Sequence, residues 1–128
     1  MFEFKNSNHQ GNAGMGAAIA YFTFSGSVVA LPLTDSQPYD LITEIDGDLK
    51  RIQIKTTSHK VRNKFTVDLR VKGGNRSGTG RTKKFDRSEA DYLFVLTSEN
   101  DRYLIPVENL GGDSIITLGS GYDDFRVI

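Results

Sequence analysis

The sequence predicts an α/β fold (an α+β mixed sheet), with an N-terminal helix packed on a central β-sheet. Three observations support this. Small and apolar residues fill positions 11–25, residues 49–57 alternate between two faces as a half-buried strand does, and β-branched and aromatic residues dominate 92–97 and 102–107. With 128 residues, 38% hydrophobic and 25% charged, the chain is expected to form a single domain over residues 1–128.

The composition excludes several other classes of protein. No apolar run approaches the roughly 20 residues that a membrane span requires. The first twelve residues are polar and lack a hydrophobic signal region, so export is not expected. The absence of cysteine excludes disulfides and thiolate metal sites and agrees with a reducing, cytoplasmic location.

The first half of the chain predicts a helix and three strands. A helix is expected over residues 12–24, with Gly26 as its stop signal. Glycines at 11, 14 and 16 each weaken it by up to about 1 kcal/mol, unless they permit close approach to another backbone. Residues 27–33 indicate a buried strand. Strands at 39–45 and 49–57 flank a DGD turn typical of a hairpin.

The second half predicts further strands around a glycine-rich segment. Strands are expected at 65–71, 92–97, 102–107 and 114–118, and helical turns at 83–90 and 107–110. Residues 72–82 hold four glycines among basic residues and predict a surface loop.

Asp40, Gln53 and Lys55 form the candidate catalytic group. The alternation of residues 49–57 places Ile52 and Ile54 on the core side, so Gln53 and Lys55 share the opposite face. Asp40 lies seven residues before the glycine of the DGD turn and Gln53 six after it. The two side chains are therefore expected to lie level across the hairpin.

This group suits metal-assisted hydrolysis of a phosphodiester. A carboxylate binds Mg²⁺, which prefers oxygen ligands, and Mn²⁺ is expected to substitute. The predicted metal ligands are Asp40, the Gln53 side chain and the backbone carbonyl of Ile54. Lys55 is expected to orient or deprotonate the attacking water.

The same residues resemble a known family. Pro38 and Asp40, separated by Tyr39, match the first half of the PD-(D/E)XK nuclease motif, and residues 53–55 match the second half. The Gln-x-Lys variant resembles the branch of small group I intron homing endonucleases, and the resemblance covers most of residues 11–110. It implies a restriction-endonuclease-like core with a basic insertion at about 59–87. It also implies Mg²⁺-dependent cleavage of double-stranded DNA in a bacterial or phage-infected cell.

Met15 departs from this family. The first helix of the family usually carries a glutamate in a pattern like G-x-x-G-E-x-A, and Met15 takes its place here. A thioether is a poor Mg²⁺ ligand. Three explanations stay open: the metal site is weaker, cleavage is lost (as an introduced inactivating substitution would cause), or another side chain supplies the ligand, the candidates being Gln10, Asn12, His9 and Glu3.

Charge is unevenly distributed along the chain. Residues 59–87 carry ten Lys or Arg and two Asp, a net charge of +8, so the rest carries six basic and fourteen acidic residues, or −8. Such a segment either contacts a polyanion or is a solvated surface loop. Arg76 and Arg81 are predicted to read guanine edges, and Lys83 and Lys84 to contact phosphates. The full set of predicted DNA-binding residues is Lys60, Arg62, Lys72, Arg76, Arg81, Lys83 and Lys84.

The predicted assembly follows from the size of the chain. One small domain carries one active site, so cutting both strands requires at least a homodimer, and the family resemblance permits a homotetramer. No membrane partner is expected. Two other functions stay open: a nuclease that resolves four-way DNA junctions, and a cleavage-deficient DNA-binding protein, suggested by Met15.

Overall fold

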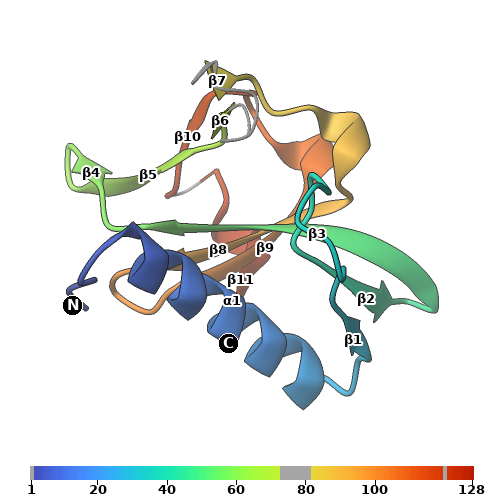
Figure 1. The fold of residues 1–128 in the computed structure, drawn as a ribbon. Coiled ribbons are helices and arrows are strands. Elements are labelled where there is room, and N and C mark those ends of the chain that lie inside the picture. The colour runs from blue at the N-terminus through green and yellow to red at the C-terminus, as the bar shows by residue number, and fades with distance from the viewer. Residues whose placement is uncertain (1, 73–81, 120) are drawn as a thin grey trace.

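The computed structural model describes residues 2–72, 82–119 and 121–128, with the side chains of residues 72 and 82 left out. Helix α1 (Ser7–Phe24) lies along one face of a six-stranded sheet, and a smaller three-stranded sheet covers the other face (Figure 1). No helix among the described residues is long and apolar enough to span a membrane.

The six-stranded sheet is mixed, which confirms the predicted fold class. Its order is β1-β2-β3-β8-β9-β11. The β3–β8 pair is parallel and its other four pairs are antiparallel. The strands are β1 (Val29–Ala30), β2 (Leu41–Ile45), β3 (Asp48–Thr57), β8 (Tyr92–Thr97), β9 (Arg102–Pro106) and β11 (Arg126–Val127).

Helix α1 begins five residues earlier than predicted. Its N-cap is Asn6, whose side-chain oxygen accepts a hydrogen bond from the His9 amide at 2.9 Å. This cap satisfies one of the free amides of the first turn and stabilises a start ahead of the glycines. The helix ends at Phe24, as predicted, just before Gly26 with φ of 85°.

The face of the sheet beneath α1 is apolar. Ala17, Ala18 and Phe22 of the helix are buried. They pack on side chains from the central strands, namely Leu41, Ile52, Phe94 and Leu96. The small residues of α1 let its backbone lie close to β3.

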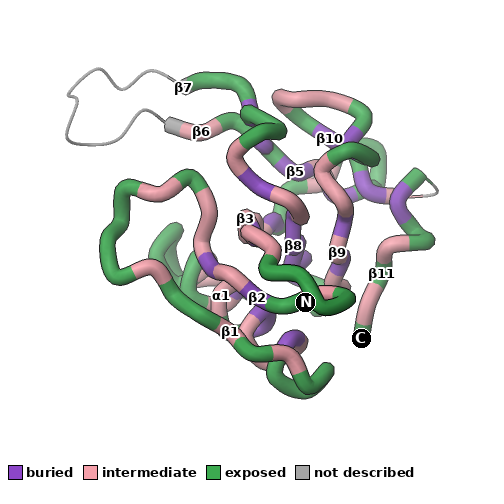
Figure 2. Tube along the Cα trace, turned by 90° about the vertical axis from the view of Figure 1, so that its right-hand side faces the viewer, coloured by how far each residue is buried: buried purple, intermediate pink, exposed green. Residues whose placement is uncertain are grey.

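The opposite face of the sheet is covered by β5 (Lys64–Asp68), which pairs with β4 (Lys60–Val61) and β10 (Ile115–Thr117). Phe65, Val67 and Leu69 are buried there against Leu93 and Val95 of β8. In Figure 2 the buried residues gather along the central strands, whereas the connection between β1 and β2 is largely exposed.

Two predicted strands are wrong in extent. Only residues 29–30 of the predicted strand 27–33 pair with a neighbour, and Leu33 is fully exposed at 102%. Pro32 lacks the amide that a longer ladder would need. The predicted strand 65–71 ends at Asp68, because its carboxylate accepts the Arg70 amide at 3.0 Å in a local turn.

The remaining elements lie close to their predicted positions. Residues 92–97 form β8 as predicted, and β9, β10 and two 3₁₀ turns (Arg87–Glu89 and Val107–Asn109) fall within predicted segments. A third 3₁₀ turn, Asp123–Phe125, precedes β11, and neither was predicted. The short strands β6 (Val71–Lys72) and β7 (Thr82–Lys83) pair at the two ends of the predicted glycine-rich loop, whose residues 73–81 lie outside the described residues.

Candidate active site

A fork between β2 and β3 defines the candidate site. The predicted hairpin is present, with positive φ at Asp46 (52°) and Gly47 (85°) in its turn. Pairing runs from Ile45↔Asp48 to Leu41↔Ile52, after which β2 ends and β3 continues to Thr57. Beyond Ile52, no described strand pairs with β3 on this side. The peptide groups there are free to bind side chains or a ligand.

Asp40 lies at the mouth of this fork. Its amide donates to the Ile52 carbonyl at 2.8 Å, which extends the hairpin register by one residue and places Asp40 level with Gln53, as predicted. Its Oδ2 accepts the Ile54 amide at 2.7 Å. Burial raises the pKa of the Asp40 carboxyl, although the Ile54 hydrogen bond and the charge of Lys55 act in the opposite direction.

Lys55 follows Ile54 on β3 and lies two residues beyond Gln53 on the same face of the strand. Its ammonium group is within 3.4 Å of the Arg70 carbonyl, a long hydrogen bond. Burial lowers the pKa of Lys55, while attraction to Asp40 and Asp68 partly offsets this effect. The Asp40 carboxylate and the Lys55 amine therefore lie near each other and are both partly shielded from water, as is typical of functional sites.

Gln53 and the Ile54 carbonyl occupy different positions around Asp40. By strand alternation Gln53 shares the face of Lys55, opposite α1, as predicted. The carbonyls of Arg51 and Thr57 accept hydrogen bonds from the β8 side. Because successive carbonyls point to alternate sides of a strand, those of the even-numbered residues between them point away from β8, toward the fork. The Ile54 carbonyl accordingly faces the open side, next to Asp40.

A cavity of about 270 Å³ joins these groups to α1. The sheet contributes Asp40, Ile54, Lys55 and Thr56 to its lining, and the helix contributes Ser7, Gln10, Gly11 and Met15. Gln53 is not among the lining residues, so the structure brings Asp40 and Lys55 together at the cavity and leaves Gln53 beside it.

A family model described as PD-(D/E)XK endonuclease matches residues 5–118. The chain belongs to this family. It is therefore an endonuclease, as the sequence predicted. None of the curated proteins compared with the chain matches it. A solved structure of a bacterial homing endonuclease, I-Ssp6803I, is similar to it with a TM-score of 0.71 and 23% identity, over 90% of this chain and 79% of that one. This likeness supports the predicted fold.

The donors at the cavity of this PD-(D/E)XK endonuclease suit a hard cation. Asp40 is the only carboxylate in the lining, and the described residues contain no group of three or more His, Cys, Asp and Glu placed to hold a metal. The lining also offers neutral oxygens, including the Ile54 carbonyl, beside the Lys55 amine and the Met15 thioether. One carboxylate with neutral oxygens fits Mg²⁺, which keeps several of its waters.

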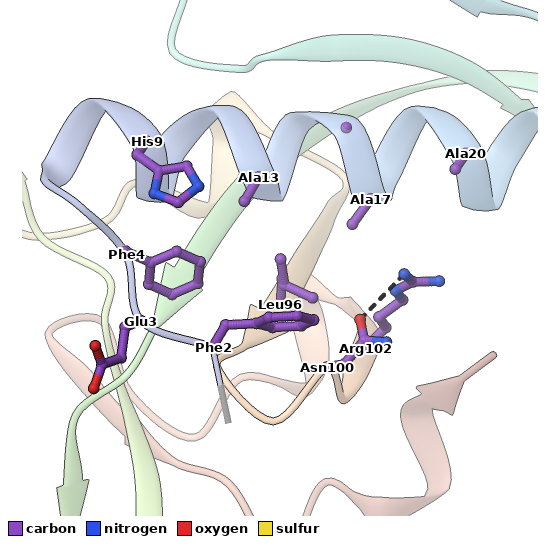
Figure 3. A pocket seen from close by; sticks show the side chains of 11 residues that line it. Phe2, Glu3, Phe4, His9, Ala13, Ala17, Ala20, Leu96, Asn100 and Arg102 are labelled. Carbon is purple, nitrogen blue, oxygen red and sulfur yellow. Dashed lines mark hydrogen bonds between the residues drawn. The ribbon is translucent and has the colours of Figure 1, made fainter.

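Met15, which takes the place of the glutamate usual in this family, lines this cavity. Of the four side chains considered as substitutes for a glutamate there, only Gln10 lines the same cavity. His9 and Glu3 line another cavity of about 390 Å³, between Phe2, Phe4 and a different side of α1 (Figure 3). Asn12 is exposed and lines neither.

The predicted DNA-binding side chains that the structure describes belong to two segments, the β4–β5 hairpin and the residues at β7 (Thr82–Lys83). Lys60 is already paired with Glu99 at 2.6 Å, and Lys83 lies 3.8 Å from Glu89. Arg62 occupies a positive-φ turn between β4 and β5, and Lys84 is exposed. Arg76 and Arg81 lie outside the described residues, as does the side chain of Lys72.

Ser7 and Thr56 also line the cavity, and neither was predicted as a site residue. Gln10 was predicted only as one of four alternatives. The amide of Gln10 donates to the Thr56 carbonyl at 2.7 Å across 46 residues of sequence. Because the local pattern carries no sign of such a distant contact, only the packing of α1 on β3 shows it.

Proposed function

We propose that this PD-(D/E)XK endonuclease is a Mg²⁺-dependent, site-specific homing endonuclease that cleaves double-stranded DNA as an oligomer. The observation that carries the proposal is the convergence of the Asp40 carboxylate, the Ile54 peptide and the Lys55 amine at one cavity beside the β2–β3 fork. Similarity to the fold of a bacterial homing endonuclease supports the more specific assignment.

Asp40 and the backbone of Ile54 would hold the cation. The Ile54 amide fixes one carboxylate oxygen of Asp40 and leaves the other available, while the Ile54 carbonyl faces the same open side of β3. Gln53 is level with Asp40 in the hairpin register but does not line the cavity, so its amide oxygen would join the cation only after a change of side-chain rotamer. Bound Mg²⁺ would stabilise negative charge on the phosphate and lower the pKa of a coordinated water.

Lys55 would act on the attacking water. Its lowered pKa increases the fraction of neutral amine, which can accept a proton from water as the oxygen bonds to phosphorus. As that bond forms, a P–O ester bond breaks and the leaving oxygen takes a proton from a solvent water. The resulting ammonium also offsets the charge of the phosphate oxygens.

Two copies of the site are needed to cut both strands of a duplex. Each chain supplies one β2–β3 fork, so a homodimer is the smallest competent assembly, and a homotetramer is a second arrangement. Of the predicted DNA-binding residues, Lys84 and Arg62 are exposed and have no ion pair among the described residues. They are the side chains best placed to neutralise phosphate, with affinity that falls as salt rises.

Cleavage of a randomised duplex library tests the proposal. The purified chain with Mg²⁺ should release fragments whose ends share a common sequence, and Lys55→Ala should release none. Lys50→Ala is the matched control, since Lys50 lies on the same strand and outside the cavity. Cleavage that survives Lys55→Ala, with Lys50→Ala equally active, would refute the mechanism.

Met15 supports a second candidate, a DNA-binding protein that does not cleave. The thioether lines the cavity and offers the cation a poor ligand. Duplex binding without any release of fragments, in Mg²⁺ or Mn²⁺, would favour this candidate. Digestion of four-way junctions but not of linear duplex would instead indicate a junction-resolving nuclease.

A further inference from the structure

We infer that Gln10 supplies the oxygen donor on the α1 side of the cavity, opposite Asp40, and that its side-chain amide helps to hold the divalent cation. This inference rests on the proposed function, because it assumes that the cavity binds a metal. It assigns a role in metal binding to a helix residue that is neither a carboxylate nor part of the Asp40, Gln53 and Lys55 group.

The orientation of the Gln10 amide follows from its one hydrogen bond. Its partner, the Thr56 carbonyl, can only accept, so the atom 2.7 Å from it must be the amide nitrogen. This bond crosses from α1 to β3 and anchors the amide nitrogen. The side chain is half-buried, which further limits its freedom.

The amide oxygen of Gln10 is left as an uncommitted acceptor. No group within residues 2–72, 82–119 and 121–128 donates a hydrogen bond to it. The same side chain lines the cavity together with Asp40, Ile54 and Lys55. An amide oxygen at this position is the kind of neutral oxygen ligand that Mg²⁺ accepts, directly or through a bound water.

The other helix residues at this cavity are less suited to the role. Ser7 is exposed in the first turn, Gly11 has no side chain, and Met15 carries sulfur. Gln10 is therefore the one half-buried side-chain oxygen that α1 brings to the lining.

Because the Gln10 amide is neutral, it adds no negative charge to the cavity that would bind the cation. Asp40 and Lys55 contribute opposite charges, so the cavity of the free protein is close to neutral. Its attraction for a divalent cation is weaker than that of a site with two carboxylates. A phosphate of bound DNA would supply the missing negative charge, so metal affinity should rise when DNA binds.

Calorimetric titration of the full chain with Mn²⁺, without DNA, tests the assignment directly. Gln10→Ala should weaken Mn²⁺ binding about tenfold, in the range found when groups supporting a metal ligand are removed. Gln10→Glu should instead tighten binding by about tenfold, because a charged oxygen replaces a neutral one. A residue that merely tethers α1 to Thr56 would lose its tether in both variants and would not change the affinity in opposite directions.

Asn12 provides the matched controls on the same helix. Asn12→Ala and Asn12→Glu change the same chemical group at an exposed position outside the cavity, so neither should alter Mn²⁺ affinity more than about twofold. Thermal unfolding of each variant establishes that it is folded. If Gln10→Glu fails to bind Mn²⁺ more tightly than the parent chain, or if Asn12→Glu tightens it equally, the inference is wrong.

Asp40→Asn separates this inference from the proposed function. Loss of Mn²⁺ binding in Asp40→Asn, with both Gln10 variants unchanged, would overturn only the role of Gln10. Unchanged Mn²⁺ binding in Asp40→Asn would overturn the metal site itself and, with it, the proposed function.

Discussion

Gly14 is the position at which a single added methyl group should disturb both the fold and the site. It is buried where α1 crosses β3. A Cβ atom there would lie 2.1 Å from Thr56 Oγ1 and 3.1 Å from Ile54 Cγ2, and separations under 3.0 Å are essentially never seen. Both neighbours belong to the strand that lines the cavity. Gly14→Ala should therefore push α1 away from β3.

Two opposing effects set the size of this change. Replacing glycine by alanine within a helix stabilises it by about 1 kcal/mol. Inserting a methyl group into a close-packed contact costs about 1–3 kcal/mol. Thr56 is short and β-branched, and two of its three staggered rotamers would direct a heavy atom at the new methyl, so little of the clash is relieved by rotation. The net expected effect is a loss of about 1 kcal/mol in the free energy of unfolding.

Urea unfolding of three variants measures this balance. Gly16→Ala is the matched control, because its added Cβ would meet nothing within 4 Å, and it should gain up to about 1 kcal/mol. Gly14→Ala combined with Thr56→Ala removes the nearest atom and should recover most of the loss relative to Thr56→Ala alone. If Gly14→Ala stabilises the chain as much as Gly16→Ala does, the close approach of α1 to β3 is refuted.

Three further predictions concern the cation and the central strand. Met15→Glu should tighten Mn²⁺ binding by about tenfold or more, since it adds a carboxylate to the cavity, and calorimetry showing no change would place residue 15 outside the site. Burial raises the pKa of Asp40, so Mn²⁺ affinity should begin to fall at a higher pH than for an ordinary aspartate; a loss confined to pH below 3.8 would contradict this. Arg51→Met removes bonds to Asp91 and the Ser88 carbonyl and should cost about 0.5–1 kcal/mol at pH 7, because the pair is screened by solvent. Because Arg51 lowers the pKa of Asp91, that contribution is present above pH 3.8 and is lost as Asp91 is protonated, so the two urea curves should converge in acid.

The elements that follow from local patterns were predictable. The strict alternation of residues 49–57 gave β3, and the DGD turn gave the hairpin register that sets Asp40 level with Gln53. A hairpin needs only short-range information, because its turn fixes which residues face each other. The residues around the fork were therefore accessible from the sequence.

Contacts between distant segments were not predictable in the same way. Residues 27–33 are rich in β-branched and apolar residues, yet only β1 (Val29–Ala30) is paired, because a neighbouring strand and not composition decides how far a ladder extends. The early start of α1 depended on the cap at Asn6, which outweighed the glycines. The link between Gln10 and Thr56 arises only once the helix has docked.

The short outer strands of the main sheet restrict how copies of the chain can associate. β1 and β11 each contain two residues, and they form its two margins. These two strands offer an approaching chain few peptide groups to hydrogen-bond with, which discourages growth of an intermolecular sheet at the two margins. We therefore expect copies of the chain to associate through side-chain contacts and not through a shared sheet. Such an assembly would leave the β2–β3 hairpin geometry unchanged as the copies come together.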